Sequence, residues 1–405
     1  MPEVVQSDRK IDSAALNELL SESIDDARAR ESTTFDVAAG GRASTIVLFG
    51  AGGLGRRTLA GLRAAGTEPV AFSDNRKDLW GTELDELRVL SPVDAAEEFG
   101  TSAAFVVTIW GAGSPHRLAH TVEQLRSLGC ETVLPTAWLY WRYADQLLPF
   151  YALDLPSKLL GQAADVRRCF ELLADDQSRH EFVDQVRWRL TGDPGHLSHP
   201  VSGEQYLVDD VARVVEGEVV LDCGAYDGDT LRSWLNVRGP SFKKYFAMEP
   251  DPHNRDLLEQ CIEGLESDIA ERVQVLPYSV AGYTGEATFS ATGSLSSSIG
   301  DGDGITVQCI RLDDLEADFG EDIPTFVKID VEGTEIDALG GGSGFLRRAR
   351  PMIAIATYHC QDHLWRVPLA IHALWSEYLL YLRPHNEEGW DLILYAVPTD
   401  RVHRD

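Results

Sequence analysis

The sequence predicts an α/β protein of two doubly wound units with a helical connector between them. Two observations carry this prediction. The segments IVLFGAGGLG (residues 46–55) and VVLDCGAYDGDT (residues 219–230) each indicate an apolar strand that runs into a glycine-rich turn and a helix. Around both segments, further apolar strands alternate with amphipathic helices, which is typical of a parallel sheet covered by helices.

The chain of 405 residues is expected to divide into a helical segment at 1–43, a Rossmann-like nucleotide-binding domain at 44–137, a helical connector at 138–202 and a second α/β domain at 203–405. The first segment predicts one amphipathic helix with Leu16 and Leu20 on its apolar face, and TTFDVAAGGR (residues 33–42) is expected to break it. From residue 44, the predicted strands are TIVLF, PVAFSD, AAFVVTIW and ETVLP, with helices predicted at 54–65, 92–99 and 116–128.

The connector is rich in aromatic residues and has helical periodicity, so we expect it to pack against its neighbours instead of forming a free linker. The second α/β domain predicts the strands EVVLDC, KYFAME, RVQVLPY, TFVKIDV and MIAIATY, followed by a closing pair, EYLLYLR and DLILYAV. Residues 290–304, rich in Gly and Ser, predict a long flexible loop.

The composition excludes several classes of function. A formal net charge of -29 argues against a nucleic-acid substrate and against docking on an anionic membrane. The cysteines form no C-x-x-C pair, and the N-terminal residues are too polar for a signal peptide. No apolar run approaches the roughly 20 residues of a membrane span. We therefore expect a soluble cytoplasmic protein with no membrane partner; a homo-oligomer is left open.

The second glycine-rich turn predicts the cofactor. Asp222, Gly224 and Gly228 form an acidic-x-Gly-x-x-x-Gly pattern in which the glycines let the backbone approach a ligand closely. A carboxylate in this loop would repel a pyrophosphate but attract the ammonium group of S-adenosylmethionine, which favours that cofactor over NAD. Glu249 ends the next strand, where a doubly wound fold presents an acid to ribose hydroxyls. For the loop alone, a generic strand-to-helix turn is a competing interpretation.

Four further side chains are expected at the same edge of the sheet. Asp330 lies near the end of the strand TFVKIDV, Glu332 and Glu335 follow that strand, and His359 follows the strand MIAIATY. Because ligands bind at the carboxyl ends of such strands, these groups are predicted to face the reacting centre. An imidazole beside carboxylates suits the deprotonation of a hydroxyl nucleophile.

Taken together, EQYLVDD, VVLDCGAYDGDT, FAMEPDP, LPYSVAG, VKIDVEGTE and IATYHCQDHLWRVPLAI resemble an FkbM-type S-adenosylmethionine-dependent methyltransferase over roughly residues 203–398. The resemblance implies that residues 203–405 form a class I methyltransferase domain, whose sheet has seven strands with an antiparallel closing strand. It also implies O-methylation, often of sugar hydroxyls. One departure is Cys223, where a small aliphatic residue such as Val is expected; we interpret it as part of the core.

Carried over by motif, the resemblance assigns a role to each matching residue. Tyr206 would close over the cofactor, Glu249 would hold its ribose, and Ser279 with Val280 would lie by the adenine. Asp330, Glu332 and His359 would face the methyl group. The methionine end of the cofactor would be lined by Asp222, Gly224, Ala225, Tyr226, Gly228 and Thr230.

Metal dependence stays open at this stage. Asp330, Glu332 and His359 could hold a Mg²⁺ ion that orients and acidifies a hydroxyl. Equally, His359 could act alone as the base, and we favour this metal-free alternative slightly because no compact acidic ligand motif is visible.

The first glycine-rich turn matches G-x-G-x-x-G through Gly50, Gly52 and Gly55, and Asp74 ends the following strand at the spacing expected of a ribose ligand. This region resembles small nucleotide-binding domains of sugar-modifying enzymes. Three interpretations compete: a nucleotide-sugar site, a dinucleotide site, or an empty scaffold used for assembly. The dinucleotide site carries less weight because no second half or substrate domain follows.

The function predicted from the sequence is therefore an S-adenosylmethionine-dependent O-methyltransferase. Its acceptor would be a hydroxyl of a sugar, a glycoconjugate or a natural product. The alternative is a non-catalytic sensor or scaffold that binds nucleotides or nucleotide-sugars.

Overall fold

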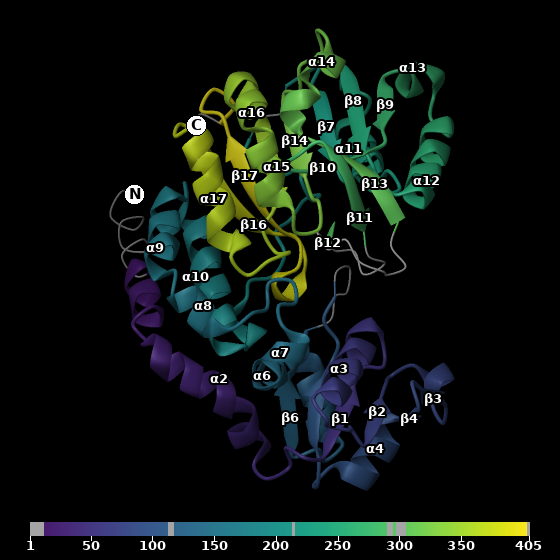
Figure 1. The fold of residues 1–405 in the computed structure, drawn as a ribbon, viewed down its shortest axis with the longest axis vertical. Coiled ribbons are helices and arrows are strands. Elements are labelled where there is room, and N and C mark those ends of the chain that lie inside the picture. Colours follow the sequence, from purple (N-terminus) through teal and green to yellow (C-terminus); the bar gives the residue numbers. More distant parts are fainter. Residues whose placement is uncertain (1–11, 112–116, 213–214, 290–294, 297–304, 403–405) are drawn as a thin grey trace. The chain divides into compact units, whose positions relative to one another are not determined.

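The computed structural model describes residues 12–111, 117–212, 215–289, 295–296 and 305–402 (Figure 1). The chain divides into two compact units. The first, called the N-terminal unit below, comprises residues 1–167, 180–200 and 386–390. The second, the C-terminal unit, comprises residues 168–179, 201–385 and 391–405.

This division differs from the domain boundaries expected from the sequence. The residues of the expected connector, 138–202, do not form a unit of their own, because they are shared between the two units. Residues 386–390, which lie inside the expected methyltransferase domain, cluster with the N-terminal unit. The expected domains were continuous ranges of the sequence, whereas each compact unit combines segments that are separate in the sequence.

The N-terminal unit contains a six-stranded sheet in the order β3-β4-β2-β1-β5-β6. All neighbouring strands run parallel except β3, which is antiparallel to β4. The predicted strands correspond to β1, β2, β5 and β6, whereas the short pair β3 and β4 was not predicted. The strands are β1 (Ile46–Phe49), β2 (Ala71–Ser73), β3 (Glu83–Leu84), β4 (Leu87–Leu90), β5 (Ala104–Val107) and β6 (Thr132–Pro135).

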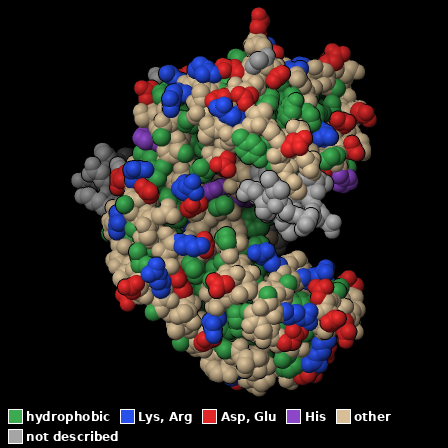
Figure 2. Space-filling view, in the orientation of Figure 1, with side chains coloured by type: hydrophobic (Ala, Val, Ile, Leu, Met, Phe, Trp, Pro, Cys, Tyr) green, Lys and Arg blue, Asp and Glu red, His purple; other side chains and the backbone are tan. Residues whose placement is uncertain are grey.

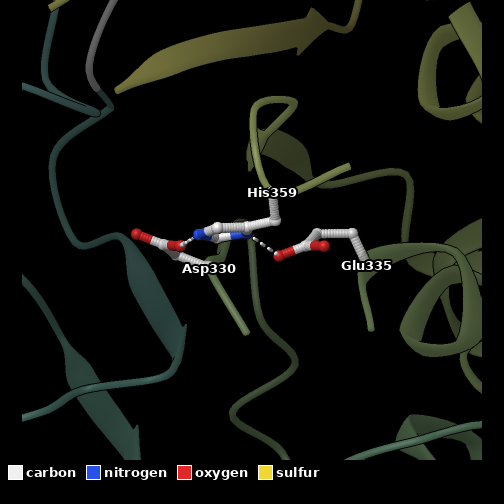
Figure 3. A group of neighbouring side chains, drawn as sticks. All are labelled: Asp330, Glu335 and His359. Carbon is white, nitrogen blue, oxygen red and sulfur yellow. Dashed lines mark hydrogen bonds and ion pairs between the residues drawn. The ribbon is translucent and has the colours of Figure 1, made fainter. Parts of the chain in front are cut away.

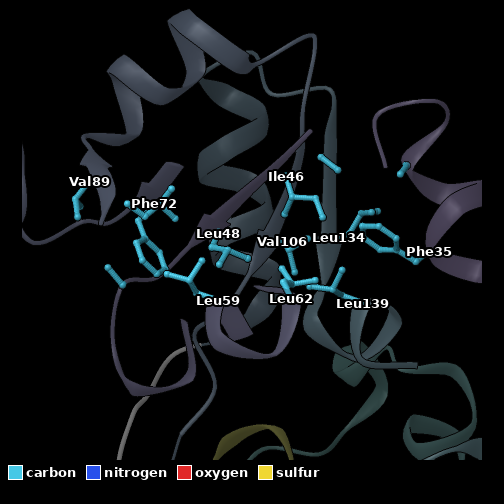
Figure 4. Close-up of a cluster of buried hydrophobic side chains, with 14 residues drawn as sticks. Phe35, Ile46, Leu48, Leu59, Leu62, Phe72, Val89, Val106, Leu134 and Leu139 are labelled. Atoms are coloured by element: carbon cyan, nitrogen blue, oxygen red, sulfur yellow. The ribbon is translucent and has the colours of Figure 1, made fainter. Parts of the chain in front are cut away.

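Helices α3 (Gly53–Ala64), α4 (Pro92–Phe99) and α5 (Leu118–Ser127) connect these strands, close to their predicted positions. Because β1 and β5 are buried along their whole length, they read as continuous apolar runs. One hydrophobic cluster joins Leu48 and Val106 of the sheet to Leu59 of α3 and Phe35 of the N-terminal helix α2 (Figure 4).

The N-terminal helices correct the prediction that residues 33–42 break the helical pattern. A helix covers residues 12–19, and α2 (Ile24–Ala39) then runs through this segment until Gly40, whose φ of 57° ends it. The hydroxyls of Thr33 and Thr34 donate to carbonyls one turn earlier, which accommodates both residues in the helix. Phe35 belongs to a buried stripe at every fourth position, and this packing outweighs the weak helix propensity of the segment.

The region expected as a helical connector is helical, as predicted. It contains α6 (Thr136–Arg142), α7 (Ala144–Leu147), α8 (Pro156–Leu160), α9 (Ala163–Leu172), α10 (Asp176–Thr191) and the single turn η2 (Pro194–His196).

The C-terminal unit contains a seven-stranded sheet in the order β16-β17-β15-β14-β7-β8-β9. Only β17 runs antiparallel to its neighbours. The expectation of seven strands with an antiparallel closing strand is confirmed. The strands are β7 (Val219–Cys223), β8 (Lys244–Met248), β9 (Val273–Leu276), β14 (Phe326–Ile329), β15 (Met352–Ala356), β16 (Leu379–Pro384) and β17 (Leu392–Val397).

The helices and helical turns of this unit are α11 (Asp229–Arg238), α12 (Pro252–Glu263), α13 (Ser267–Ala270), η3 (Leu312–Asp314), α14 (Glu316–Phe319), α15 (Glu335–Gly341), α16 (Ser343–Ala349) and α17 (His363–Leu374). The strands β7, β14, β15 and β17 are buried throughout, as expected at the centre of such a sheet. The prediction of two doubly wound α/β units is therefore confirmed.

A second sheet in this unit was not predicted. It has four strands in the order β10-β13-β11-β12. The predicted strand RVQVLPY is interrupted at Pro277, so that β10 (Tyr278–Val280) leaves the main sheet and pairs in parallel with β13 (Ile305–Ile310). Strands β11 (Gly285–Phe289) and β12 (Leu295–Ser296) complete the sheet. Apart from β12, the loop predicted at 290–304 lies outside the described residues.

The sequence contains both acidic and basic residues, and side chains of both kinds lie on the surface (Figure 2). Acidic and basic side chains of the described residues are interspersed on the face that Figure 2 displays. Among the described residues, no helix has the length and apolar character needed to cross a membrane.

Candidate active site

The candidate site lies in the C-terminal unit, where three parallel strands end side by side. Ile329 at the end of β14 is in register with Cys223 at the end of β7 and with Ile355 of β15. The glycine-rich turn follows β7, Asp330 follows β14 and His359 follows β15. The topology therefore brings to one edge of the sheet groups that are far apart in the sequence.

A buried ion pair lies beneath the glycine-rich turn. Lys328 Nζ is 3.1 Å from Asp222 Oδ1, and it also donates to the carbonyl oxygen of Gly224 (2.5 Å). The Tyr245 hydroxyl donates to Asp222 Oδ2 (2.7 Å). Burial alone would lower the pKa of Lys328, but the Asp222 carboxylate outweighs burial and raises it. Lys328 therefore stays charged and holds the turn against the end of β14.

Asp222 was predicted to attract the ammonium group of a cofactor, and this stays a prediction. The structure shows that its side chain is fully buried and that both oxygens already have partners within the protein. Asp222 thus supports the turn from below. The loop residues that follow it are closer to the surface, since Tyr226 is 53% exposed.

Gly224 is required by the close approach of the turn to β14. Its φ is 91°, and a Cβ atom there would lie 2.0 Å from the carbonyl oxygen of Asp330. Ala225 is buried, and its N–H donates to the Met248 carbonyl (2.9 Å). Gly228 has φ 88° and precedes α11, in whose first turn Thr230 is buried. The backbone of the turn is therefore fixed at both ends.

Glu249 closes the turn from the neighbouring strand. Its Oε2 accepts from the N–H of Tyr226 (2.9 Å), and its Oε1 accepts from the N–H of Asp251 (2.8 Å). Burial raises the pKa of Glu249, although these two N–H groups oppose the shift. A carboxylate held in this way keeps further lone pairs for a ligand hydroxyl.

Ser279 and Val280 were predicted to lie by the adenine. Both are buried in β10, the first strand of the second sheet, and Ser279 is in register with Cys309 of β13. The predicted role stays untested, but the two residues follow directly on β9, which pairs with β8.

Tyr206 is the residue that joins the preceding segment to the acidic rim. Its hydroxyl donates to Asp330 Oδ2 (2.5 Å), and its N–H donates to the Tyr395 hydroxyl (2.9 Å). The Nζ atom of Lys328 lies 5.4 Å from the centroid of the Tyr206 ring. Tyr206 has a φ of 68°, a strained value for a bulky residue, and such strain often marks functional sites.

His359 lies between two acids, as Figure 3 shows. Its Nδ1 is 2.7 Å from Glu335 Oε1, and its Nε2 is 3.3 Å from Asp330 Oδ1. Glu332 is more distant, at 3.7 Å from Nε2, and its side chain is 52% exposed. The structure thus brings His359 and Asp330 together as predicted. The acid closest to His359 is Glu335, on the Nδ1 side of the ring, and not Glu332.

The sequence interpretation understated Glu335 and missed His363. Glu335 is fully buried, and its second oxygen, Oε2, lies 3.1 Å from His363 Nδ1. One carboxylate therefore serves two imidazoles, His359 at the end of β15 and His363 at the start of α17. The spacing of four residues in HCQDH was the available signal, because it can place two histidines toward one partner when a helix begins there.

The acids determine the protonation of His359. Burial alone would lower its pKa, but Glu335, with help from Asp330 and Glu332, raises it to about 10. The same interaction holds the pKa of Glu335 well below its usual range, against the effect of burial. In the ligand-free protein the imidazole is therefore protonated at neutral pH.

This shift predicts how stability depends on pH. The pKa of His359 rises from its ordinary 6.5 to about 10 on folding, so its contribution to stability is complete below pH 6.5 and is lost as the pH rises toward 10. We expect the free energy of unfolding to fall over this range. Urea unfolding at several pH values would measure the fall, and a His359→Gln variant should show a shallower one. An equal slope in both proteins would contradict the assignment.

The residues do not fit the Mg²⁺ ion that the sequence left open. One oxygen or nitrogen each from Asp330, Glu335 and His359 lies within 4.8 Å of the others, which is close enough for a shared ion. However, Nδ1 of His359 is held by Glu335, and Oδ2 of Asp330 accepts from Tyr206. Mg²⁺ prefers oxygen ligands and retained water. No step is therefore assigned to a metal.

The first glycine-rich turn lies in the N-terminal unit and resembles the second in construction. Asp74 Oδ2 accepts from the N–H of Ala51 (2.7 Å), as Glu249 does from Tyr226. A Cβ at Gly55 would lie 1.9 Å from the Gly50 carbonyl oxygen, and one at Gly50 would lie 2.7 Å from that of Thr108. Packing alone therefore requires two of the three glycines.

Gly52 is different, because a Cβ there would meet nothing within 4 Å. The nucleotide or nucleotide-sugar site predicted for this turn stays a prediction. The arrangement of Gly50, Gly55 and Asp74 is explained without a ligand.

Residues 222–386 match the family model described as the methyltransferase FkbM domain. The C-terminal unit carries an FkbM methyltransferase domain. The matched range contains the glycine-rich turn from Asp222 onward, Glu249, the second sheet and the Asp330–His359 rim, and it leaves out Tyr206.

A crystal structure of the methyltransferase FkbM from Methylobacillus flagellatus KT is similar over both units. It has a TM-score of 0.73 at 21% sequence identity and covers 98% of this chain and 100% of that chain. This likeness shows that the chain has the fold of that protein, with its class I methyltransferase domain. No curated protein sequence matches the chain.

Two other solved structures each match just under half of this chain. The precorrin-6y C5,15-methyltransferase from Geobacter metallireducens GS-15 has a TM-score of 0.29 at 15% identity, covering 46% of this chain and 84% of its own. A putative rRNA-methylase from Clostridium thermocellum has a TM-score of 0.29 at 13% identity, covering 47% and 90%. Such low TM-scores support no argument about this chain.

Proposed function

We propose that the protein is an S-adenosylmethionine-dependent O-methyltransferase whose acceptor is a hydroxyl of a small molecule, such as a sugar, a glycoconjugate or a natural product. The observation that carries the proposal is the line Glu335–His359–Asp330 at the carboxyl ends of β14 and β15. An imidazole oriented by a buried carboxylate supports the proposal, because it neighbours Asp330, whose backbone closely approaches Gly224 of the glycine-rich turn.

The residues present fit the methyl donor. Glu249 offers a fixed carboxylate at the strand end, and Tyr226 presents an exposed ring at the turn. When bound, S-adenosylmethionine supplies an electrophilic methyl group on a sulfonium. The chain would hold the donor through the turn and Glu249, while the fixed backbone aligns the reacting groups.

His359 is the group suited to remove the proton of the acceptor hydroxyl. Its Nδ1 is fixed by Glu335, so its Nε2 faces Asp330 and the more exposed Glu332. A positively charged sulfonium bound nearby would lower the pKa of the imidazole, since like charges disfavour the charged form. Donor binding would thereby release the proton and leave a neutral base beside the acceptor.

The experiment has two steps. Calorimetric titration with S-adenosylhomocysteine tests the donor site, and a methyl-transfer assay over free sugars, glycosides and matched amines tests the acceptor class. We expect binding, and transfer to alcohols only. Binding without transfer to any acceptor would favour the alternative function, a non-catalytic sensor; no binding would end the proposal.

One substitution tests the donor site directly. We expect Glu249→Gln to weaken S-adenosylhomocysteine binding about tenfold or more, because hydrogen bonds to a charged group contribute about 1.5–3 kcal/mol. The amide oxygen can accept from only one of the two backbone N–H groups, those of Tyr226 and Asp251, so circular dichroism should first show that the variant is folded. Glu259→Gln, an exposed acid on α12, removes the same charge and should leave the affinity unchanged. Equal affinity in all three proteins would show that Glu249 does not contact the cofactor.

A further inference from the structure

We propose that the N-terminal unit contains a second ligand site, which binds an organic amine with an apolar body. The site is a pocket at the carboxyl ends of β5 and β6, and all the described residues that line it belong to the N-terminal unit. Its walls include Val107, Trp110, Pro135, Leu153, Trp188 and Glu388. Counted out to its open mouth, and including the solvent there, the space measures about 410 Å³, so a ligand would be only partly enclosed.

Aromatic rings form one side of this pocket. The rings of Trp110 and Trp188 have centroids 5.6 Å apart and are tilted by 59°. Trp110 also packs on Trp390, which is not one of the lining residues, and the centroids of these two rings are 4.8 Å apart. Indole faces attract both apolar groups and cations, and cation binding strengthens when water is excluded.

Glu388 is the single carboxylate in the lining, and it is 4% exposed. The N–H of Leu118 donates to its Oε1 (2.5 Å), and the indole N–H of Trp110 donates to its backbone oxygen (3.0 Å). Glu388 has φ 55° and ψ 40°, a left-handed conformation that is uncommon for a residue other than glycine. Packing holds the residue in this strained conformation, and such strain clusters at binding sites.

The electrostatics of Glu388 favour a cation as the missing partner. Burial raises its pKa to about 7, while the Leu118 N–H and Arg117 oppose the shift and Glu387 and Asp193 add to it. Arg117 itself forms an ion pair with Glu387, at 3.2 Å, so its charge is largely compensated by that carboxylate. An ammonium group in the pocket would supply the counter-charge that keeps Glu388 ionised.

Other classes of ligand fit less well. An anion would be repelled by Glu388, and a neutral apolar molecule would leave the carboxylate desolvated. A saccharide needs several hydrogen-bonding groups, but the hydroxyl that the described residues place in the lining, that of Thr136, already donates to the Val107 carbonyl. An amine with an aromatic or aliphatic body uses both the indoles and the acid.

The test compares 2-phenylethylamine with 2-phenylethanol, which has the same body without the charge. Calorimetric titration of the full-length protein should show binding of the amine, stronger at pH 8 than at pH 6, and clearly weaker binding of the alcohol. Glu388→Gln keeps the acceptor for Leu118 but loses the charge, and should weaken amine binding about tenfold or more. Glu123→Gln, an exposed acid on α5, should leave it unchanged.

A second variant keeps the test decisive if Glu388→Gln does not fold. Ala137→Leu would fill the pocket from its wall and should remove binding of both probes. No amine binding to the unaltered protein, equal binding of amine and alcohol, or an unaffected Glu388→Gln variant would each overturn the proposal. Because these measurements involve no methyl donor, they stand apart from the proposed methyl transfer.

Discussion

Replacing Lys328 with methionine should destabilise the C-terminal unit by about 3–5 kcal/mol, the typical cost of breaking a buried ion pair from one side. The substitution leaves the Asp222 carboxylate fully buried with Tyr245 as its remaining hydrogen-bond donor. It also removes the donor to the Gly224 carbonyl, which ties the glycine-rich turn to β14. Guanidinium unfolding followed by far-UV circular dichroism would measure the loss.

Two comparisons isolate the buried charge as the cause. The double variant Lys328→Met/Asp222→Asn contains no unpaired charge, so it should be more stable than Lys328→Met alone. Lys243 forms an exposed pair with Asp322 at 2.6 Å, and Lys243→Met should change stability little. If the loss of stability in the double variant equalled the sum of the losses in the two single variants, the buried pair would not be the source of the effect.

The sheets were predictable because their central strands are buried on both faces. Such strands must be apolar throughout, so TIVLF and MIAIATY can be recognised as strands without knowing which strands they pair with. This prediction depends on local sequence alone, which is why the structure confirms it.

The second sheet and α2 could not be predicted in the same way. Strand β10 has three residues, and its partner β13 lies beyond a long insertion, so no local alternation marks the pair. In α2, threonines and a nearby pair of glycines suggest a break, whereas the buried positions of Phe35 and Ala39 keep the helix intact. Tertiary packing decided both elements.

The candidate site was partly predictable for the same reason. Motif positions placed Asp330 and His359 on one edge of the sheet, because the carboxyl ends of parallel strands meet there. The partner of each group in the folded protein could not be predicted. Nothing in the sequence indicates that Lys328 neutralises Asp222, or that Glu335 rather than Glu332 fixes His359, because these pairings depend on side-chain directions in the folded chain.

If His359 is the base, His359→Gln should lower turnover by about 10²–10⁴, the usual contribution of a general base. The affinity for S-adenosylhomocysteine should change little, since Nε2 lies next to Asp330 and Glu332, whereas the glycine-rich turn and Glu249 are proposed to hold the donor. Single-turnover methyl transfer and calorimetric titration would measure the two quantities separately. Loss of both together would indicate that His359 only stabilises the fold.

Glu335→Gln separates positioning from simple structural support. The amide can still accept a hydrogen bond from His359 Nδ1, but it lacks the charge that raises the pKa of the imidazole to about 10. The pKa should therefore fall, and the rise of turnover with pH should begin at a lower pH than in the unaltered enzyme. Glu332→Gln, whose side chain is half exposed and 3.7 Å from Nε2, should move the profile less. A profile that stayed in place in Glu335→Gln would mean that another group takes the proton, and Asp330, 3.3 Å from His359 and bonded to Tyr206, would be the first residue to test.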